Sequence, residues 1–112
     1  MMTCKFPDDC SNMAEVRAAV DATDRALMEL LDRRFGYMRA AARIKQNRDK
    51  VRDEKRKSEV VANVRTDAVA RGLPADALAA IWGHLVEASI AYELGEWDRI
   101  SAAIEPPSAR AR

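Results

Sequence analysis

The sequence is poor in aromatic residues and in histidine, and both shortages narrow what the chain can be. Aromatic residues make up only 5% of the 112 residues. Alanine, leucine, valine and methionine dominate instead, which favours helices over a β-sheet. The single histidine, His84, is expected to be a partly exposed helical residue. The chain therefore offers no serine–histidine or cysteine–histidine pair on which nucleophilic catalysis could be built.

Cysteine is equally scarce, and no long apolar run is present. Cys4 and Cys10 both precede the first helical pattern. We interpret them as free thiols in a reducing cytosol, with a disulfide between them as the alternative. No apolar stretch approaches the roughly 20 residues of a membrane span, and the N-terminus lacks a signal-peptide core. With 19 basic and 18 acidic residues, the net charge is only +1. We expect one soluble cytoplasmic domain that does not bind membranes.

A very long first helix is predicted from residue 13 to about residue 46. Asn12 is a typical N-cap, and Glu15 stands where a capping box requires it. Apolar or small residues then recur at helical spacing: Val16, Val20, Thr23, Leu27, Leu30, Leu31, Met38 and Ala41. Such a helix is on the order of 50 Å long. It cannot fold back within so small a domain, so we expect a second copy of the chain to cover its apolar face.

Two shorter helices are predicted after a polar loop at residues 47–52. Asp53 is expected to cap the second helix, which ends at Arg71 and Gly72. Its inward face is predicted to carry Arg56, Val60, Val64 and Ala68. The third helix is predicted over residues 75–100, with Leu78, Ile81, Leu85 and Ser89 on one stripe. No strand pattern is present.

The sequence thus predicts an all-α protein. The protomer has three helices, of which the first is very long, and two protomers form an intertwined helical homodimer. The helical domain covers residues 12–100. Residues 1–11 are expected to form an irregular arm, and residues 101–112 a disordered tail.

Polar and charged residues interrupt the apolar stripes at several positions. Arg34 and Lys45 are almost three helical turns apart, so they share a face and lie about 16 Å apart along the axis. Arg56 leads the stripe of the second helix, and Ser89 and Glu93 continue that of the third. A buried cation needs a counter-charge, which an acidic side chain or an anionic ligand would supply. Alternatively, the long stems reach solvent at the edge of each stripe.

Arg17 raises a geometric problem of its own. It precedes Lys45 by about 42 Å on a straight helix, so the two cannot hold one small ligand within one chain. An antiparallel partner helix would bring Arg17 to the other subunit's Lys45. A two-fold dimer would then contain two equivalent sites, each with an arginine from the partner.

The pattern of these residues resembles the all-helical chorismate mutases of the AroQ type, over about residues 12–97. The matching residues of the first helix are Arg17, Val20, Asp21, Asp24, Leu30, Leu31, Arg33, Arg34 and Lys45. Val51-Arg52-Asp53, followed by Arg56, resembles the family's next element. The opening of the chain is also similar to the related isochorismate pyruvate lyases, which share the fold and the site.

The resemblance implies that four cations bind a dianionic substrate. Arg34 and Arg17 of the partner subunit would clamp the two carboxylates, and Arg56 would add a further carboxylate contact. Lys45 would lie between a carboxylate and the ether oxygen. Guanidinium groups suit this role because they bind carboxylates through two parallel hydrogen bonds.

The remaining implied contacts include two departures from the family. Asp53 would bind the ring hydroxyl and Ser89 a carboxylate. The family often has a glutamate after the arginine of the second helix, where this chain has Lys57. Glu93 occupies a position that is commonly glutamine and would face the ether oxygen. A carboxyl group donates a hydrogen bond only when protonated, so we expect activity to rise toward acid pH.

The implied reaction is a concerted rearrangement of chorismate, for which we predict neither a metal nor a cofactor. The protein must hold the reactive conformer and stabilise charge on the breaking ether bond. Two alternatives on the same site are isochorismate pyruvate lyase, giving salicylate and pyruvate, and a mutase for an amino analogue of chorismate. Two non-enzymatic alternatives are a purely structural helical dimer and a nucleic-acid-binding dimer. The last would use the basic segment 43–57, although the near-zero net charge disfavours it.

Overall fold

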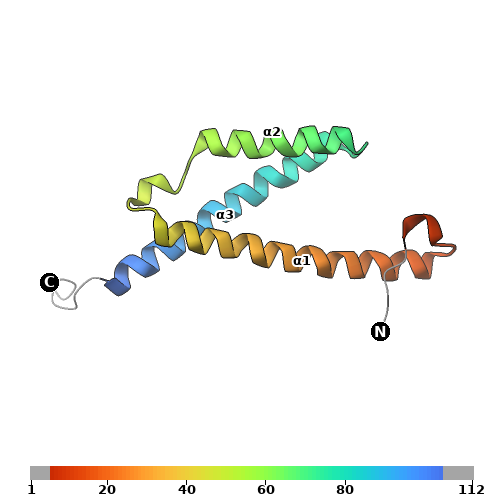
Figure 1. Ribbon diagram of the computed structural model, residues 1–112, viewed down its shortest axis with the longest axis horizontal. Helices are drawn as coiled ribbons and strands as arrows, with labels where there is room; N and C mark the ends of the chain where they lie inside the picture. Colours follow the sequence, from red (N-terminus) through yellow and green to blue (C-terminus); the bar gives the residue numbers. More distant parts are fainter. Residues whose placement is uncertain (1–5, 105–112) are drawn as a thin grey trace. The chain divides into compact units, whose positions relative to one another are not determined.

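The computed structural model describes residues 6–104, and every regular element in that range is helical (Figure 1). In chain order these are η1 (Pro7–Asp9), α1 (Met13–Ile44), η2 (Arg48–Lys50), α2 (Glu54–Ala70) and α3 (Ala75–Ile104), where η marks a short 3-10 helix. The prediction of an all-α chain with a long first helix is confirmed. The chain divides into two compact units, Met1–Gly36 and Tyr37–Arg112, with the boundary inside α1.

The start of α1 in the first unit is fixed by the predicted cap. The Glu15 backbone N–H donates to Asn12 Oδ1 at 2.9 Å, which satisfies one of the free amides of the first turn. In return, Glu15 Oε1 accepts from the Ser11 backbone N–H at 2.8 Å and from the Ser11 hydroxyl at 3.2 Å. In a standard capping box the Glu15 carboxylate would accept from the backbone N–H of the N-cap, Asn12; here it accepts from Ser11, the residue before it. Cys10, just before this cap, is a free thiol, and Cys4 lies outside the described residues.

The apolar stripe of α1 in the first unit is largely exposed within the part of the chain that the structure describes. Val20, Leu27 and Leu30 keep 51%, 49% and 55% of their surface exposed. Val16 and Leu31 are half-buried. Leaving three large aliphatic side chains half in water forgoes on the order of 1 kcal/mol of burial for each. The stripe predicted from the sequence exists, and residues 6–104 leave these three side chains about half exposed.

In the second unit, α2 and α3 lie side by side and run in opposite directions (Figure 1). The turn between them depends on Gly72, whose φ of 69° lies in the left-handed region that glycine adopts without strain. The Leu73 N–H donates to the Ala68 carbonyl at 2.9 Å, and the Gly72 N–H to the Val69 carbonyl at 3.1 Å. This pair of bonds is a Schellman motif, and it ends the second helix at Arg71 and Gly72, where the sequence predicted.

The core of the second unit forms where the α1–α2 connection meets α3. Val51, Val86 and Ile90 are buried there, and Val60, Leu94 and Trp97 pack against them. The buried residues of α3 are Ala79, Val86, Ser89, Ile90 and Glu93.

The predicted stripe of α3 was partly wrong. Ser89 is buried, but Ile81 is 55% exposed. Apolar residues are spread around much of this helix, so several faces were compatible with the sequence. The face that carries Val86 and Ile90 is the one that packs.

Two helix ends differ from the prediction. Helix α1 ends at Ile44 rather than near residue 46, and η2 occupies part of the predicted loop. Helix α3 extends to Ile104, beyond the predicted end at Ile100. The rest of the predicted tail, residues 105–112, lies outside the described residues, as does the first part of the arm, residues 1–5. No helix within residues 6–104 has the length and apolar character needed to cross a membrane.

Candidate active site

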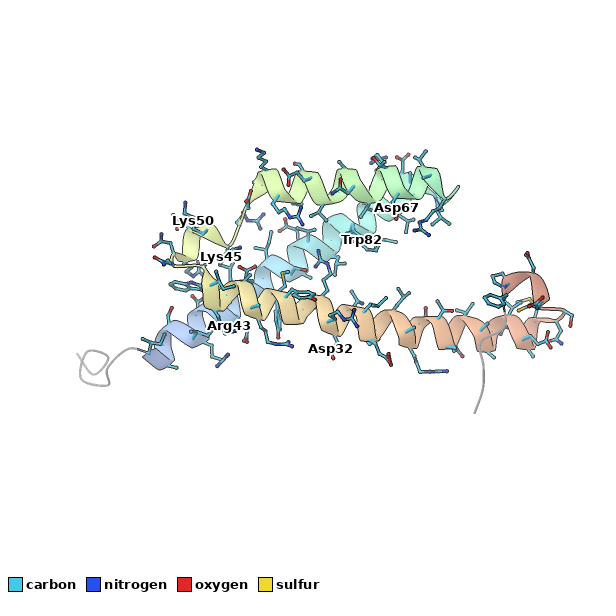
Figure 2. The ribbon with its side chains drawn as sticks, in the orientation of Figure 1. Asp32, Arg43, Lys45, Lys50, Asp67 and Trp82 are labelled. Carbon is cyan, nitrogen blue, oxygen red and sulfur yellow. The ribbon has the colours of Figure 1, made fainter. Side chains whose placement is uncertain are left out.

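The centre of the candidate site is an ion pair between the partly exposed Lys45 and the buried Glu93. Lys45 directly follows α1, and its backbone N–H still donates to the Ala41 carbonyl at 2.9 Å. Its Nζ lies 2.8 Å from Glu93 Oε2. Glu93 is only 4% exposed, and Figure 2 shows Lys45 at the end of α1, where α3 passes. The sequence analysis placed these two residues in one site, and the structure brings them together.

The environment of Glu93 Oε2 is unusual for a carboxylate oxygen. The atom is sealed from solvent and accepts no hydrogen bond from the described residues. Lys45 Nζ lies 2.8 Å from this atom, and the contact is an ion pair. The Lys45 ammonium also donates a hydrogen bond to the Val51 carbonyl at 3.4 Å. Buried charged atoms need compensation, so this oxygen depends on the charge of the Lys45 ammonium.

Ser89 belongs to the same face of α3, one helical turn before Glu93. It is 3% exposed, and its Oγ donates to the Leu85 carbonyl at 2.7 Å. Residues four apart on a helix lie one above the other, so Ser89 and Glu93 form a short polar strip within an otherwise apolar face. A hydroxyl oxygen also retains lone pairs as acceptors, so Ser89 still has hydrogen-bonding capacity.

Asp53 and Arg56 lie in the first turn of α2. Asp53 is the N-cap, as predicted, and its Oδ1 accepts from the Arg56 backbone N–H at 3.0 Å. The prediction that the Arg56 side chain faces inward is wrong for this structure. Its guanidinium is exposed and lies 3.6 Å from Glu59 Oε1. The long stem lets this group reach solvent from the edge of the helix, as the alternative interpretation allowed.

Arg17 and Arg34 belong to the first unit, on the part of α1 before the boundary. The Arg17 side chain is exposed and that of Arg34 is half-buried. Lys45, Ser89, Glu93, Asp53 and Arg56 all belong to the second unit.

The sequence analysis missed a set of side chains that tie the segment after α1 to α3. Trp97 Nε1 donates to the Lys45 carbonyl at 3.1 Å. Arg48 binds Asp98 through two hydrogen bonds of 2.8 and 3.2 Å. No local sequence signal could have revealed these pairs, because about fifty residues separate their members.

A second ion-pair cluster centres on Glu87. Its two carboxylate oxygens accept from Arg52 at 2.7 and 3.0 Å. Lys57 Nζ also donates to Oε2, at 2.6 Å. The hydrogen bond from Arg52, and to a lesser extent the one from Lys57, lowers the pKa of Glu87 to about 2. In the same way, Arg48 lowers the pKa of Asp98. The position at which the family often has glutamate is thus occupied by a lysine bonded to α3.

These contacts also account for much of the basic segment 43–57. Five of its eight basic side chains form ion pairs within the chain: Lys45, Arg48, Arg52, Arg56 and Lys57. Cations already paired with carboxylates have less to gain from binding phosphates. The segment therefore gives little support to nucleic-acid binding. Within residues 6–104, no three histidine, cysteine, aspartate or glutamate side chains gather as metal ligands would.

Comparison with known proteins gives matches over most of the chain. Residues 16–94 match the family described as chorismate mutase type II. The chain is also similar to the isochorismate pyruvate lyase of Pseudomonas aeruginosa. The two are 27% identical over 93 residues, which cover 83% of this chain and 92% of the lyase. The matched region includes Lys45, Asp53, Ser89 and Glu93.

Proposed function

The chain belongs to the chorismate mutase type II family, and we propose that it converts chorismate to prephenate. The observation that carries this proposal is the contact between Lys45 and the buried Glu93. The reaction is an isomerisation in which an ether C–O bond breaks while a C–C bond forms, and no atom is gained or lost. It needs restraint of the reactive conformer and stabilisation of charge rather than a nucleophile.

We assign substrate binding to the cationic and polar side chains identified in the sequence. Chorismate is a dianion, and Arg34 together with Arg17 of the partner subunit would clamp its two carboxylates. Arg56 and Ser89 would add carboxylate contacts. The exposed guanidinium of Arg56 would have to leave Glu59, which costs little because exposed ion pairs are weak. Asp53 would accept a hydrogen bond from the ring hydroxyl.

Lys45 and Glu93 are assigned to the ether oxygen, where negative charge grows as the C–O bond breaks. A fixed ammonium that is partly withdrawn from water stabilises that charge more strongly than a free ammonium in bulk solvent would. Glu93 adds to this only when its carboxyl is protonated and can donate a hydrogen bond. The burial of Glu93 next to Lys45 supports assigning both side chains to the same atom of the substrate.

A homodimer is part of the proposal, because it would supply Arg17 to each site. The exposed aliphatic stripe of Val20, Leu27 and Leu30 supports an antiparallel pairing of two α1 helices. Sedimentation should then give a dimer of the 12.5 kDa chain. Replacing Leu27 by glutamate should shift the protein toward monomers, whereas the same change at the exposed Ala77 of α3 should not.

A second candidate is an isochorismate pyruvate lyase, which would form salicylate and pyruvate on the same residues. The similarity to the Pseudomonas aeruginosa lyase over most of both chains favours it. The sequence Val51-Arg52-Asp53 and the glutamate at position 93 favour the mutase. The choice rests on how the site orients the pyruvyl group relative to the ring.

The test is to offer the purified protein chorismate and isochorismate separately and to identify the products. Prephenate from chorismate supports the proposal, and Lys45→Ala should abolish its formation. Salicylate and pyruvate from isochorismate, without prephenate from chorismate, would replace the mutase by the lyase. Turnover of neither compound would overturn both assignments.

A further inference from the structure

The segment that joins α1 to α2 is held against α3 at two points. This segment, residues 45–53, is called the linker here, and it carries Lys45 at its start and Asp53 at its end. Near its start, Arg48 binds Asp98 through both guanidinium nitrogens that face it. Near its end, Arg52 binds Glu87 in the same forked way. Forked guanidinium–carboxylate pairs fix orientation as well as distance.

We infer that Glu87 and Asp98 are positioning residues, which clamp the linker so that Lys45 and Asp53 stay fixed relative to Ser89 and Glu93 on α3. The inference rests on the proposed function for the roles of Lys45 and Asp53. The clamps themselves are contacts of the second unit alone.

Lys45 is held at both its main chain and its ammonium. The Trp97 indole N–H donates to the Lys45 carbonyl at 3.1 Å, at the end of α1 where carbonyls lack helical partners. The ammonium donates to the Val51 carbonyl at 3.4 Å. Val51 lies between the two clamped arginines and is buried in the core. A shift of the linker would therefore move the acceptor that helps to place the ammonium.

Asp53 is bracketed in a similar way. Arg52 precedes it directly, and Lys57 follows it by one helical turn. Both cations bind the single carboxylate of Glu87, with Lys57 Nζ at 2.6 Å from Oε2. Glu87 thus ties both sides of the α2 N-cap to the helix that carries Ser89 and Glu93.

Because these ion pairs lie at the surface, their main effect is to orient the linker rather than to raise the free energy of unfolding. Arg48, Asp98, Arg52 and Glu87 are all between 41% and 56% exposed at the side chain. Exposed pairs contribute little to the free energy of unfolding. Their effect on the geometry of a nearby site can be much larger, because small displacements of reacting groups lower rates steeply.

The experiment compares Asp98→Asn, Glu87→Gln and the double variant with Asp67→Asn. The control breaks the Arg71–Asp67 pair, which is also exposed and arginine-based but lies outside the linker. With chorismate, each clamp variant should lower kcat by on the order of 10-fold, with a smaller change in KM. Asp67→Asn should leave both constants unchanged. The reciprocal exchange Arg48→Asp with Asp98→Arg should recover most of the kcat lost in Asp98→Asn.

Amide hydrogen exchange gives a second measurement that needs no substrate. The Lys50 and Val51 amides donate to the Asn47 and Arg48 carbonyls, both at 3.1 Å, so they report on the order of the linker. Both should exchange faster in the clamp variants than in Asp67→Asn. Unchanged exchange, or a kcat in the double variant equal to that of the control, would overturn the inference. If the wild type turns over neither substrate but the exchange still rises, the clamp stands and the proposed function fails.

Discussion

Lys45 and Glu93 are separated by 48 positions in the sequence, yet their charged atoms lie 2.8 Å apart. Glu93 is almost wholly buried, so Lys45 is the nearby charge that makes an ionised carboxylate tolerable there. The same ammonium is the cation assigned to the ether oxygen of the substrate. Stability and catalysis therefore depend on one contact, and substitutions can separate the two effects.

Lys45→Met should remove activity and destabilise the fold together. We expect kcat/KM to fall by on the order of 10²–10³-fold, because a fixed charge is lost from the transition state. The free energy of unfolding should fall by about 1–3 kcal/mol, because Glu93 loses its partner. Denaturant unfolding and steady-state kinetics measure the two effects.

Adding Glu93→Gln to Lys45→Met provides the decisive comparison. The double variant no longer buries an unpaired charge, so it should regain most of the lost stability and none of the lost activity. Lys50→Met, at an exposed position in η2, is the matched control and should change neither quantity. A stable but inactive single variant would mean that Glu93 does not depend on Lys45.

Glu93→Gln alone should change the pH dependence of the reaction. An amide donates a hydrogen bond at any pH, whereas a carboxyl does so only when protonated. We expect kcat/KM of the wild type to rise toward acid pH, and that of the variant to vary by less than about twofold. Kinetics in buffers of constant ionic strength measure both profiles.

The control for this profile is His84→Gln. Histidine is the side chain that ordinarily titrates between about pH 5 and 8, and His84 is the only one in the sequence. It is exposed on α3, so its replacement should leave the profile as it is in the wild type. A flat wild-type profile would rule out a protonated Glu93 as the donor.

Much of the fold could be predicted from the sequence, because the interactions that start and end its helices join residues only a few positions apart. Asn12 caps α1 through the amide three residues later, and Gly72 closes α2 through bonds within six residues. The buried face of α3 was harder to predict, because Ile81 and Val86 lie on different faces of the helix and both are apolar. Only packing against Val51, from another part of the chain, decides between them.

The candidate site, too, could be predicted from the sequence only in part. Charges on apolar stripes pointed to Lys45 and Glu93, and the family resemblance assigned them to one site. The inward direction predicted for Arg56 was wrong, because a long side chain at the edge of a helix can reach water. The clamps on Asp98 and Glu87 could not be predicted, since opposite charges are common along the chain and spacing does not say which of them meet.

The proposed exchange of Arg17 between subunits makes a prediction about mixtures. Arg17→Ala and Lys45→Ala should each be inactive alone. In a heterodimer of the two, one site carries both substitutions and the other carries neither. Refolding the two variants together at equal amounts should therefore restore about one quarter of the wild-type activity, since half of the dimers are mixed and each has one intact site.

The control mixes Arg17→Ala with the double variant Arg17→Ala/Lys45→Ala, which leaves no intact site in any dimer. No activity should return. If the first mixture also stays inactive while the subunits demonstrably exchange, Arg17 does not act in the partner's site.

The charge cluster at Glu87 predicts how stability responds to acid. Arg52 and Lys57 lower its pKa in the folded protein to about 2, from an ordinary value of 4.5. The folded state therefore binds the Glu87 proton less readily than the unfolded state does. This stabilisation is small because the pairs are exposed; it is complete above pH 4.5 and is lost as the pH falls toward 2. Glu87→Gln removes the titrating group, so the Tm difference between wild type and variant should shrink across this window.

Thermal unfolding of both proteins at several values between about pH 6 and pH 2 measures that difference. The side chain of Glu87 is 41% exposed, so added salt should also reduce the difference at pH 6. The other carboxylates titrate alike in both proteins, so their contributions cancel in the Tm difference. A Tm difference that stays constant from pH 6 to pH 2 would mean that Arg52 and Lys57 do not stabilise the ionised form of Glu87, and the second clamp of the linker would lose its electrostatic basis.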